Sequence, residues 1–136
     1  MAERMTLIDS EYAYLWYYPD QKIVHHQWKK YAFDNAFREV IMKGADAFEQ
    51  YGAVKWLSDD RNFGALHPDD KKWGDANWVP RVRKAGWKYW AMVLPEKVVG
   101  QMSISRITQE YSKALGLEVN IFSDPDKAMK WLESKT

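Results

Sequence analysis

Two acidic residues and an arginine follow a short apolar run near the middle of the chain. The run AVKWL (53–57) ends at Ser58, and Asp59, Asp60 and Arg61 come directly after it. A carboxylate pair can bind a metal ion or a polar ligand, and an arginine can clamp an anion. The alternative is a turn, in which an aspartate accepts a hydrogen bond from the backbone two residues later and pairs with Arg61. Successive strand residues point to opposite faces, so the two aspartates are not expected to share a proton.

Histidines are the remaining candidates for acid–base chemistry or metal binding. With Asp59 or Asp60, His67 could serve a hydrolase, but the chain has no GxSxG motif and no cysteine to act as nucleophile. The alternative for His67 is a surface position near the start of a helix. His25 and His26 are adjacent on an expected strand and point to opposite faces, so they cannot bind one metal ion together. The sequence therefore predicts no catalytic residue, no metal site and no cofactor.

The chain is unusually aromatic, with 8 Trp, 8 Tyr and 5 Phe. Large rings of this kind usually build the core. The alternative is an aromatic-lined crevice that binds a small molecule or a lipid-like ligand. Trp73 and Trp78 are the candidates, because their spacing places them on different faces of a helix. One would pack on the sheet, and the other could line a crevice beside the acidic turn.

The spacing of apolar residues predicts one α/β domain over residues 1–136, with residues 1–10 as an N-terminal extension. The expected strands are 12–18, 22–28, 53–57, 87–94 and 117–122, and the expected helices are 33–51, two pieces within 68–84, 96–115 and a capped helix within 123–134. Asp34 is the expected N-cap of the first helix, and Gly52 and Gly116 are expected to end the helices before them. Ser123 or Asp124 is expected to cap the last helix, which Pro125 opens. The first two strands form an antiparallel hairpin around PDQ. Strands that alternate with helices predict parallel pairing for the rest. We therefore expect a small mixed, mostly parallel five-stranded sheet in the order β-β-α-β-α-β-α-β-α.

Composition argues against several classes of function. Lys and Arg total 20 against 19 Asp and Glu, which gives no electrostatic reason to bind nucleic acid or an anionic membrane surface. No run approaches the roughly 18 consecutive apolar residues that a membrane span needs, so we expect no membrane insertion. The first residues, MAERMTLIDSEYAY, lack the apolar segment of a secretory signal. A cytoplasmic location is therefore expected.

The element order and three segments resemble the SpoIIAA-like (STAS) family. The segments are AVKWLSDD, RKAGWKYWAMVLP and GLEVNIFSDPDKAMKWL, and the last is similar to the small stand-alone STAS-like proteins of bacteria. The resemblance covers the chain from about residue 11. It implies a sheet covered by helices chiefly on one side. It also implies a non-enzymatic regulatory or protein-binding module.

The best-known members of that family are anti-sigma factor antagonists, in which a partner kinase phosphorylates a Ser or Thr after the third strand. The matching segment here, RNFGALHPDD, has no hydroxyl between Arg61 and Asp70. Asp69 and Asp70 already place negative charge in the first helical turn, where a phosphate would bind. The phosphorylation switch therefore does not carry over to this chain.

An interaction surface is expected where residues 58–67 meet residues 68–84. It would bind a protein partner or a small ligand, and a free sheet edge would also allow a homodimer. The expected binding residues are Asp59, Asp60, Arg61, His67, Trp73 and Trp78.

Overall fold

The computed structural model describes residues 3–135, which form a six-stranded sheet and five helices. The strands are β1 (Met5–Asp9), β2 (Ala13–Tyr18), β3 (Ile23–Trp28), β4 (Lys55–Asp59), β5 (Tyr89–Val93) and β6 (Glu118–Phe122). The helices are α1 (Asn35–Tyr51), α2 (Pro68–Asn77), α3 (Val79–Lys84), α4 (Val98–Leu115) and α5 (Pro125–Glu133). No helix in this described range has the length and apolar character needed to cross a bilayer.

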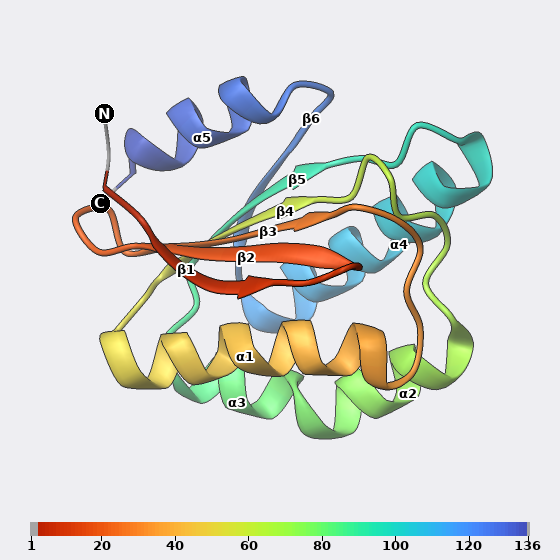
Figure 1. Cartoon of the computed structure of the whole chain (residues 1–136), viewed down its shortest axis with the longest axis horizontal. Coiled ribbons are helices and arrows are strands. Elements are labelled where there is room, and N and C mark those ends of the chain that lie inside the picture. Colours follow the sequence, from red (N-terminus) through yellow and green to blue (C-terminus); the bar gives the residue numbers. More distant parts are fainter. Residues whose placement is uncertain (1–2, 136) are drawn as a thin grey trace.

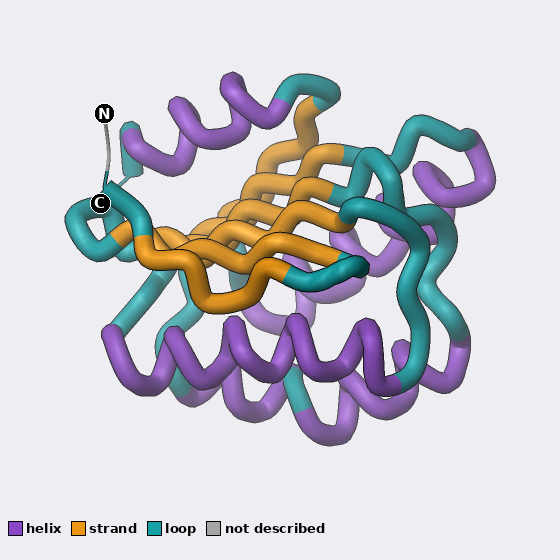
Figure 2. The backbone as a smooth tube through the Cα atoms, viewed as in Figure 1, coloured by secondary structure: helices purple, strands orange, loops and turns teal. Residues whose placement is uncertain are grey.

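The strands lie side by side in chain order. The pairs β1–β2 and β2–β3 are antiparallel, whereas β3–β4, β4–β5 and β5–β6 are parallel. Right-handed crossovers that always advance in one direction place their helices on one face of a sheet. Accordingly α1, α2, α3 and α4 lie on one side and α5 lies on the other (Figure 1). Figure 2 shows the sheet as one twisted layer between these two sets of helices.

The predicted ends of several helices are confirmed. Gly52 and Gly116 end α1 and α4 in the left-handed conformation, with φ of 72° and 67°. Glycine is favoured there because it has no Cβ to clash with the backbone. The side chain of Asp124 accepts a hydrogen bond from the backbone N–H of Asp126, and Pro125 opens α5.

The five-stranded prediction missed β1. Residues assigned to an N-terminal extension instead form this edge strand, which pairs with β2 and carries an irregularity between Thr6 and Ile8. Its residues are exposed or half-buried because it has a neighbour on only one side. Five such residues give little alternation for sequence reasoning to detect. The strand predicted over 53–57 also lies two residues later, so that Ser58 and Asp59 belong to β4.

Alternation of side chains divides the core between the two faces of the sheet. The face toward α1–α4, which we call the helical face, carries Val24 and Trp28 of β3 and Trp56 of β4. The opposite face, which we call the α5 face, carries Ile23 of β3 and Leu57 of β4. The expected separation of His25 and His26 is confirmed, because each contacts a different one of these two clusters.

His25 is a buried titratable group on the α5 face. Its Nδ1 lies 3.3 Å from the hydroxyl of Tyr18, whereas its Nε2 has no hydrogen-bond partner among residues 3–135. Burial, with a smaller effect of the neighbouring groups His26, Arg4 and Arg61, lowers the pKa of His25 from 6.5 to about 3. The ring is therefore neutral in the folded protein near neutral pH.

This lowered pKa makes the free energy of unfolding depend on pH. An unfolded chain takes up a proton on His25 below pH 6.5, whereas the folded chain does so only near pH 3. The contribution of His25 to the free energy of unfolding should be fully present above pH 6.5. It should fall by about 1.4 kcal/mol per pH unit as the pH drops from 6.5 towards 3. In His25→Gln this share of the pH dependence should disappear, as measured by urea unfolding followed through tryptophan fluorescence. The matched control His67→Asn changes an exposed histidine and should keep the wild-type slope; an unchanged slope in His25→Gln contradicts the assignment.

Candidate functional site

A cavity of about 80 Å³ lies between the helical face of the sheet and helices α1–α4. Its volume is enough for about three water-sized groups. Eight of its twenty lining residues are Trp, Tyr or Phe. The tryptophans that line it are Trp28, Trp56, Trp78, Trp87 and Trp90. Ser58, Asp60 and Thr108 are among its few polar residues, an arrangement typical of small-molecule sites.

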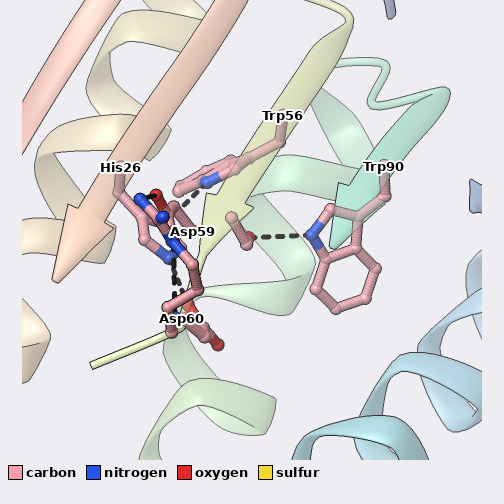
Figure 3. A network of polar contacts seen from close by, with 7 residues as sticks. His26, Trp56, Asp59, Asp60 and Trp90 are labelled. Atoms are coloured by element: carbon pink, nitrogen blue, oxygen red, sulfur yellow. Dashed lines mark hydrogen bonds and ion pairs between the residues drawn. The ribbon is translucent and has the colours of Figure 1, made fainter. Parts of the chain in front are cut away.

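A hydrogen-bonded chain of three buried side chains forms one polar wall of the cavity (Figure 3). The indole Nε1 of Trp56 donates to Nδ1 of His26 over 2.9 Å. On the other side of the ring, Nε2 of His26 lies 2.8 Å from Oδ1 of Asp60. An indole N–H can only donate, so Nδ1 must be the acceptor and the ring hydrogen must be on Nε2. His26 is therefore a neutral imidazole that donates to Asp60, and both of its nitrogens are engaged.

The sheet and α1 hold this chain in place. Parallel pairing sets His26 of β3 beside Ser58 of β4. The ring of Trp56 lies directly against the backbone of α1 at Gly44, where a Cβ would overlap it. Ser58 accepts a hydrogen bond of 2.9 Å from the indole Nε1 of Trp90 on β5. Ser58 is thus a buried hydrogen-bond partner inside β4 and does not close the strand, because β4 continues to Asp59.

Asp59 and Arg61 form the turn that was the alternative to a ligand site. Asp59 Oδ1 accepts from the backbone N–H of Arg61 over 3.3 Å, and the guanidinium donates to both carboxylate oxygens over 2.9 and 2.8 Å. Alternation along β4 directs Asp59 to the α5 face, away from the cavity. Asp60 belongs to the cavity and Asp59 does not, so the two carboxylates cannot act as a pair.

Asp70 ties the start of α1 to the start of α2. Its carboxylate accepts from the backbone N–H of Asp34 over 3.0 and 3.1 Å and from Nε of Arg38 over 2.9 Å. Asp34 occupies the predicted N-cap position, but its side chain makes no capping hydrogen bond and its φ is 54°. A positive φ is costly for a residue with a Cβ, and here the contacts with Asp70 hold the backbone in it.

The other three predicted residues lie in different environments. His67 is exposed and caps α2, with Nδ1 accepting from the backbone N–H of Asp69 over 3.1 Å. Trp73 is half-buried, and the guanidinium of Arg38 lies 5.1 Å from its ring centre. Trp78 is buried, donates to the carbonyl of Ile41 over 3.0 Å and lines the cavity.

The six predicted residues therefore do not form one exposed surface. Asp59, Asp60 and Trp78 are buried, because β4 runs two residues further than expected and α2 places Trp78 under the sheet. Of the six, Asp60 and Trp78 line the cavity. Trp78 lines a cavity together with Asp60, whereas Asp59 and Arg61 of the acidic turn are not among the lining residues.

Sequence reasoning missed His26, Trp56 and Trp90. Alternation alone could have placed His26 with Trp28, and Trp56 with Ser58, on common faces of their strands. Contact between the strands depends on their register, which no local pattern encodes. No group of three or more His, Asp or Glu residues within 3–135 is placed to hold a metal ion.

The hydrogen bond from Trp56 gives a testable assignment of the His26 ring. Heteronuclear NMR at neutral pH should show the Nε2–H form of His26 in the wild type. In Trp56→Phe, Nδ1 of His26 loses its donor and the free energy of unfolding should fall by about 1–3 kcal/mol. The matched control Trp90→Phe removes an indole that bonds to Ser58, so the His26 ring signals should remain as in the wild type. A wild-type ring in the Nδ1–H form contradicts the assignment.

Comparison with known proteins supports the fold. No protein-family model and no curated protein matches the chain. A solved structure does match: an uncharacterized protein of the DUF3478 family with a SpoIIAA-like fold, from Shewanella loihica PV-4. The two chains share 15% identity with a TM-score of 0.51, over 97% of this chain and 92% of the other. The chain therefore has a SpoIIAA-like fold, as the sequence resemblance implied.

Proposed function

We propose that the protein is a non-catalytic binding module that holds a small ligand in the cavity under the helical face. The observation that carries the proposal is the cavity itself, with aromatic walls and a polar wall built from His26 and Asp60. Concave apolar sites with a few placed polar groups are the usual form of small-molecule sites. The sequence left open an aromatic-lined crevice that binds a small molecule, and this cavity is the candidate for it.

The same geometry gives no support to a histidine as general base. A general base needs a free nitrogen or oxygen within reach of the proton it removes. Both ring nitrogens of His26 are engaged, by Trp56 and Asp60. His67 caps α2 and lies outside the lining of the cavity that contains Asp60. The hydrolase alternative, which used His67 with Asp59 or Asp60, therefore has no assembled site to support it.

Gly74 of α2 provides a direct way to block the cavity. It is buried and lines the cavity, and a Cβ at this position would have no heavy atom within 4 Å. A larger side chain at residue 74 would extend into this open space. Replacing Gly74 by leucine also removes a glycine from a helix interior, which should raise the free energy of unfolding by up to about 1 kcal/mol.

Filling the cavity should prevent binding without unfolding the protein. Xenon is a suitable probe because it enters small apolar cavities and reports its surroundings in the xenon NMR spectrum. The wild type should show saturable xenon binding that perturbs the indole N–H signals of Trp56 and Trp90. Gly74→Leu should lose this binding while its melting temperature stays equal or rises.

The control for Gly74→Leu is Lys72→Leu, which places the same side chain on the solvent side of α2. It should bind xenon as the wild type does. Equal binding by Gly74→Leu and Lys72→Leu, or no binding by a folded wild type, refutes the proposed ligand cavity.

Protein docking is the second candidate function, and the first two turns of α4 favour it. Val98, Val99 and Met102 are 67%, 73% and 61% exposed. Neighbouring apolar side chains left in solvent often mark an interaction surface. This surface on α4 differs from the interaction surface predicted over residues 58–84. The two are adjacent, because Gly100 of α4 packs tightly against Gly64 in the loop that precedes α2.

A second copy of the chain is the first partner to test for this surface. If α4 mediates self-association, sedimentation equilibrium should show a concentration-dependent dimer that Val99→Asp weakens by at least about tenfold, with unchanged thermal stability. Lys113→Asp, an exposed position further along α4, is the control and should dimerise normally. A wild type that stays monomeric at high concentration excludes the second copy as partner.

A further inference from the structure

Three aspartates are buried among residues 3–135, and their partners differ. Asp59 pairs with the guanidinium of Arg61, and Asp70 pairs with that of Arg38. Both therefore have a permanently cationic partner. Asp60, which is 5% exposed, pairs with His26. Buried carboxylates usually need a cation or several hydrogen bonds, because removing them from water is costly.

His26 does not supply the missing positive charge. The indole N–H of Trp56 is directed at Nδ1, so the ring is the neutral Nε2–H form. A hydrogen on Nδ1 would face the indole hydrogen. Oδ1 of Asp60 accepts from His26, whereas Oδ2 accepts no hydrogen bond from residues 3–135. The polar wall of the cavity thus carries an unused acceptor and an uncompensated carboxylate.

The cation that also lines the cavity is already engaged. The ammonium of Lys71 lies 2.6 Å from Asp75 and 2.8 Å from Glu110. The hydroxyl of Tyr111 also donates to Asp75. Lys71 is thus shared by two carboxylates outside the cavity lining and does not pair with Asp60, which leaves the charge of Asp60 to favour a positively charged ligand.

The remaining walls also suit a cation. Trp78, Trp87, Trp90 and Tyr111 form a closed circuit of neighbouring rings, with centroid distances of 5.4, 4.9, 6.2 and 6.3 Å in turn. All four line the cavity. Aromatic faces carry partial negative charge and attract organic ammonium groups, most strongly where water is excluded. Carboxylate and rings together thus select for both the charge and the apolar surface of an alkylammonium.

We propose that the ligand of this cavity carries a small alkylammonium group, which pairs with Oδ2 of Asp60 and packs against the tryptophan rings. The inference rests on the proposed binding function and names its ligand class. The cavity of about 80 Å³ limits the enclosed part to a few non-hydrogen atoms. A probe with so few non-hydrogen atoms is expected to bind with a dissociation constant in about the millimolar range.

Ethylammonium and ethanol are matched probes for this proposal, because they have the same shape and differ in charge. Each is titrated into the wild type at fixed ionic strength, set with potassium chloride. Binding is followed by the indole N–H signals of Trp56 and Trp90, and by the upfield shift that aromatic walls impose on the methyl protons of the probe. Ethylammonium should bind at least about tenfold more tightly than ethanol.

Asp60→Asn is the decisive variant. An asparagine can still accept from Nε2 of His26 through its carbonyl oxygen, but it lacks the charge. The preference for ethylammonium over ethanol should fall to less than about threefold, because the charge that distinguishes the two probes is gone. The indole N–H spectrum of Asp60→Asn reports whether the variant folds. If it does not fold, the comparison of ethylammonium with ethanol in the wild type still tests the proposal.

The outcomes separate the ligand class from the cavity function. Equal or tighter binding of ethanol, or xenon binding with no ethylammonium binding, overturns the cation proposal and leaves the cavity function standing. A preference that persists in folded Asp60→Asn also overturns the role of this carboxylate. If xenon, ethanol and ethylammonium all fail to bind the folded wild type, the proposed function fails with the inference.

Discussion

An indole N–H can donate a hydrogen bond but cannot accept one, and this asymmetry organises the interior of the protein. By donating to His26, Trp56 determines which ring nitrogen carries the hydrogen and hence that His26 donates to Asp60. A buried imidazole used in this way is a structural spacer between an indole and a carboxylate. The chemistry left to the cavity is therefore that of Asp60 and the surrounding rings.

The architecture explains why this cavity lies on the helical face. Each parallel crossover returns its helix to the helical face, so that face is covered by α1–α4 while the α5 face is closed by one short helix. Five tryptophans line the space beneath the thicker cover. Protein interiors usually pack to nearly crystalline density. Several large, rigid rings on one face are harder to fit together than smaller side chains, and they leave a gap between them.

Features set by local chemistry were predictable from the sequence. The glycines after α1 and α4, the cap of α5 and the antiparallel hairpin each depend on neighbouring residues, and all were placed correctly. The turn at Asp59 and Arg61 was one of two interpretations left open, and the structure selects it. Exposed β1 was missed because half-buried edge residues scarcely alternate.

The composition of the site was not predictable, because it depends on contacts between distant residues. His26 and Asp60 are 34 positions apart and meet only through parallel pairing of β3 with β4. The sequence placed Asp70 in the first turn of a helix, but its burial and its hydrogen bonds to the backbone of Asp34 depend on contact between distant segments.

The close approach of Gly44 to Trp56 has an evolutionary consequence. A methyl group on residue 44 would overlap the indole, so a tryptophan at 56 is compatible only with glycine in that turn of α1. In a homologue with a smaller residue at position 56, this overlap would be absent. Position 44 could then carry alanine, which is the better helix former. The two identities should therefore be inherited together, and a lineage that loses one would be expected to drift at the other.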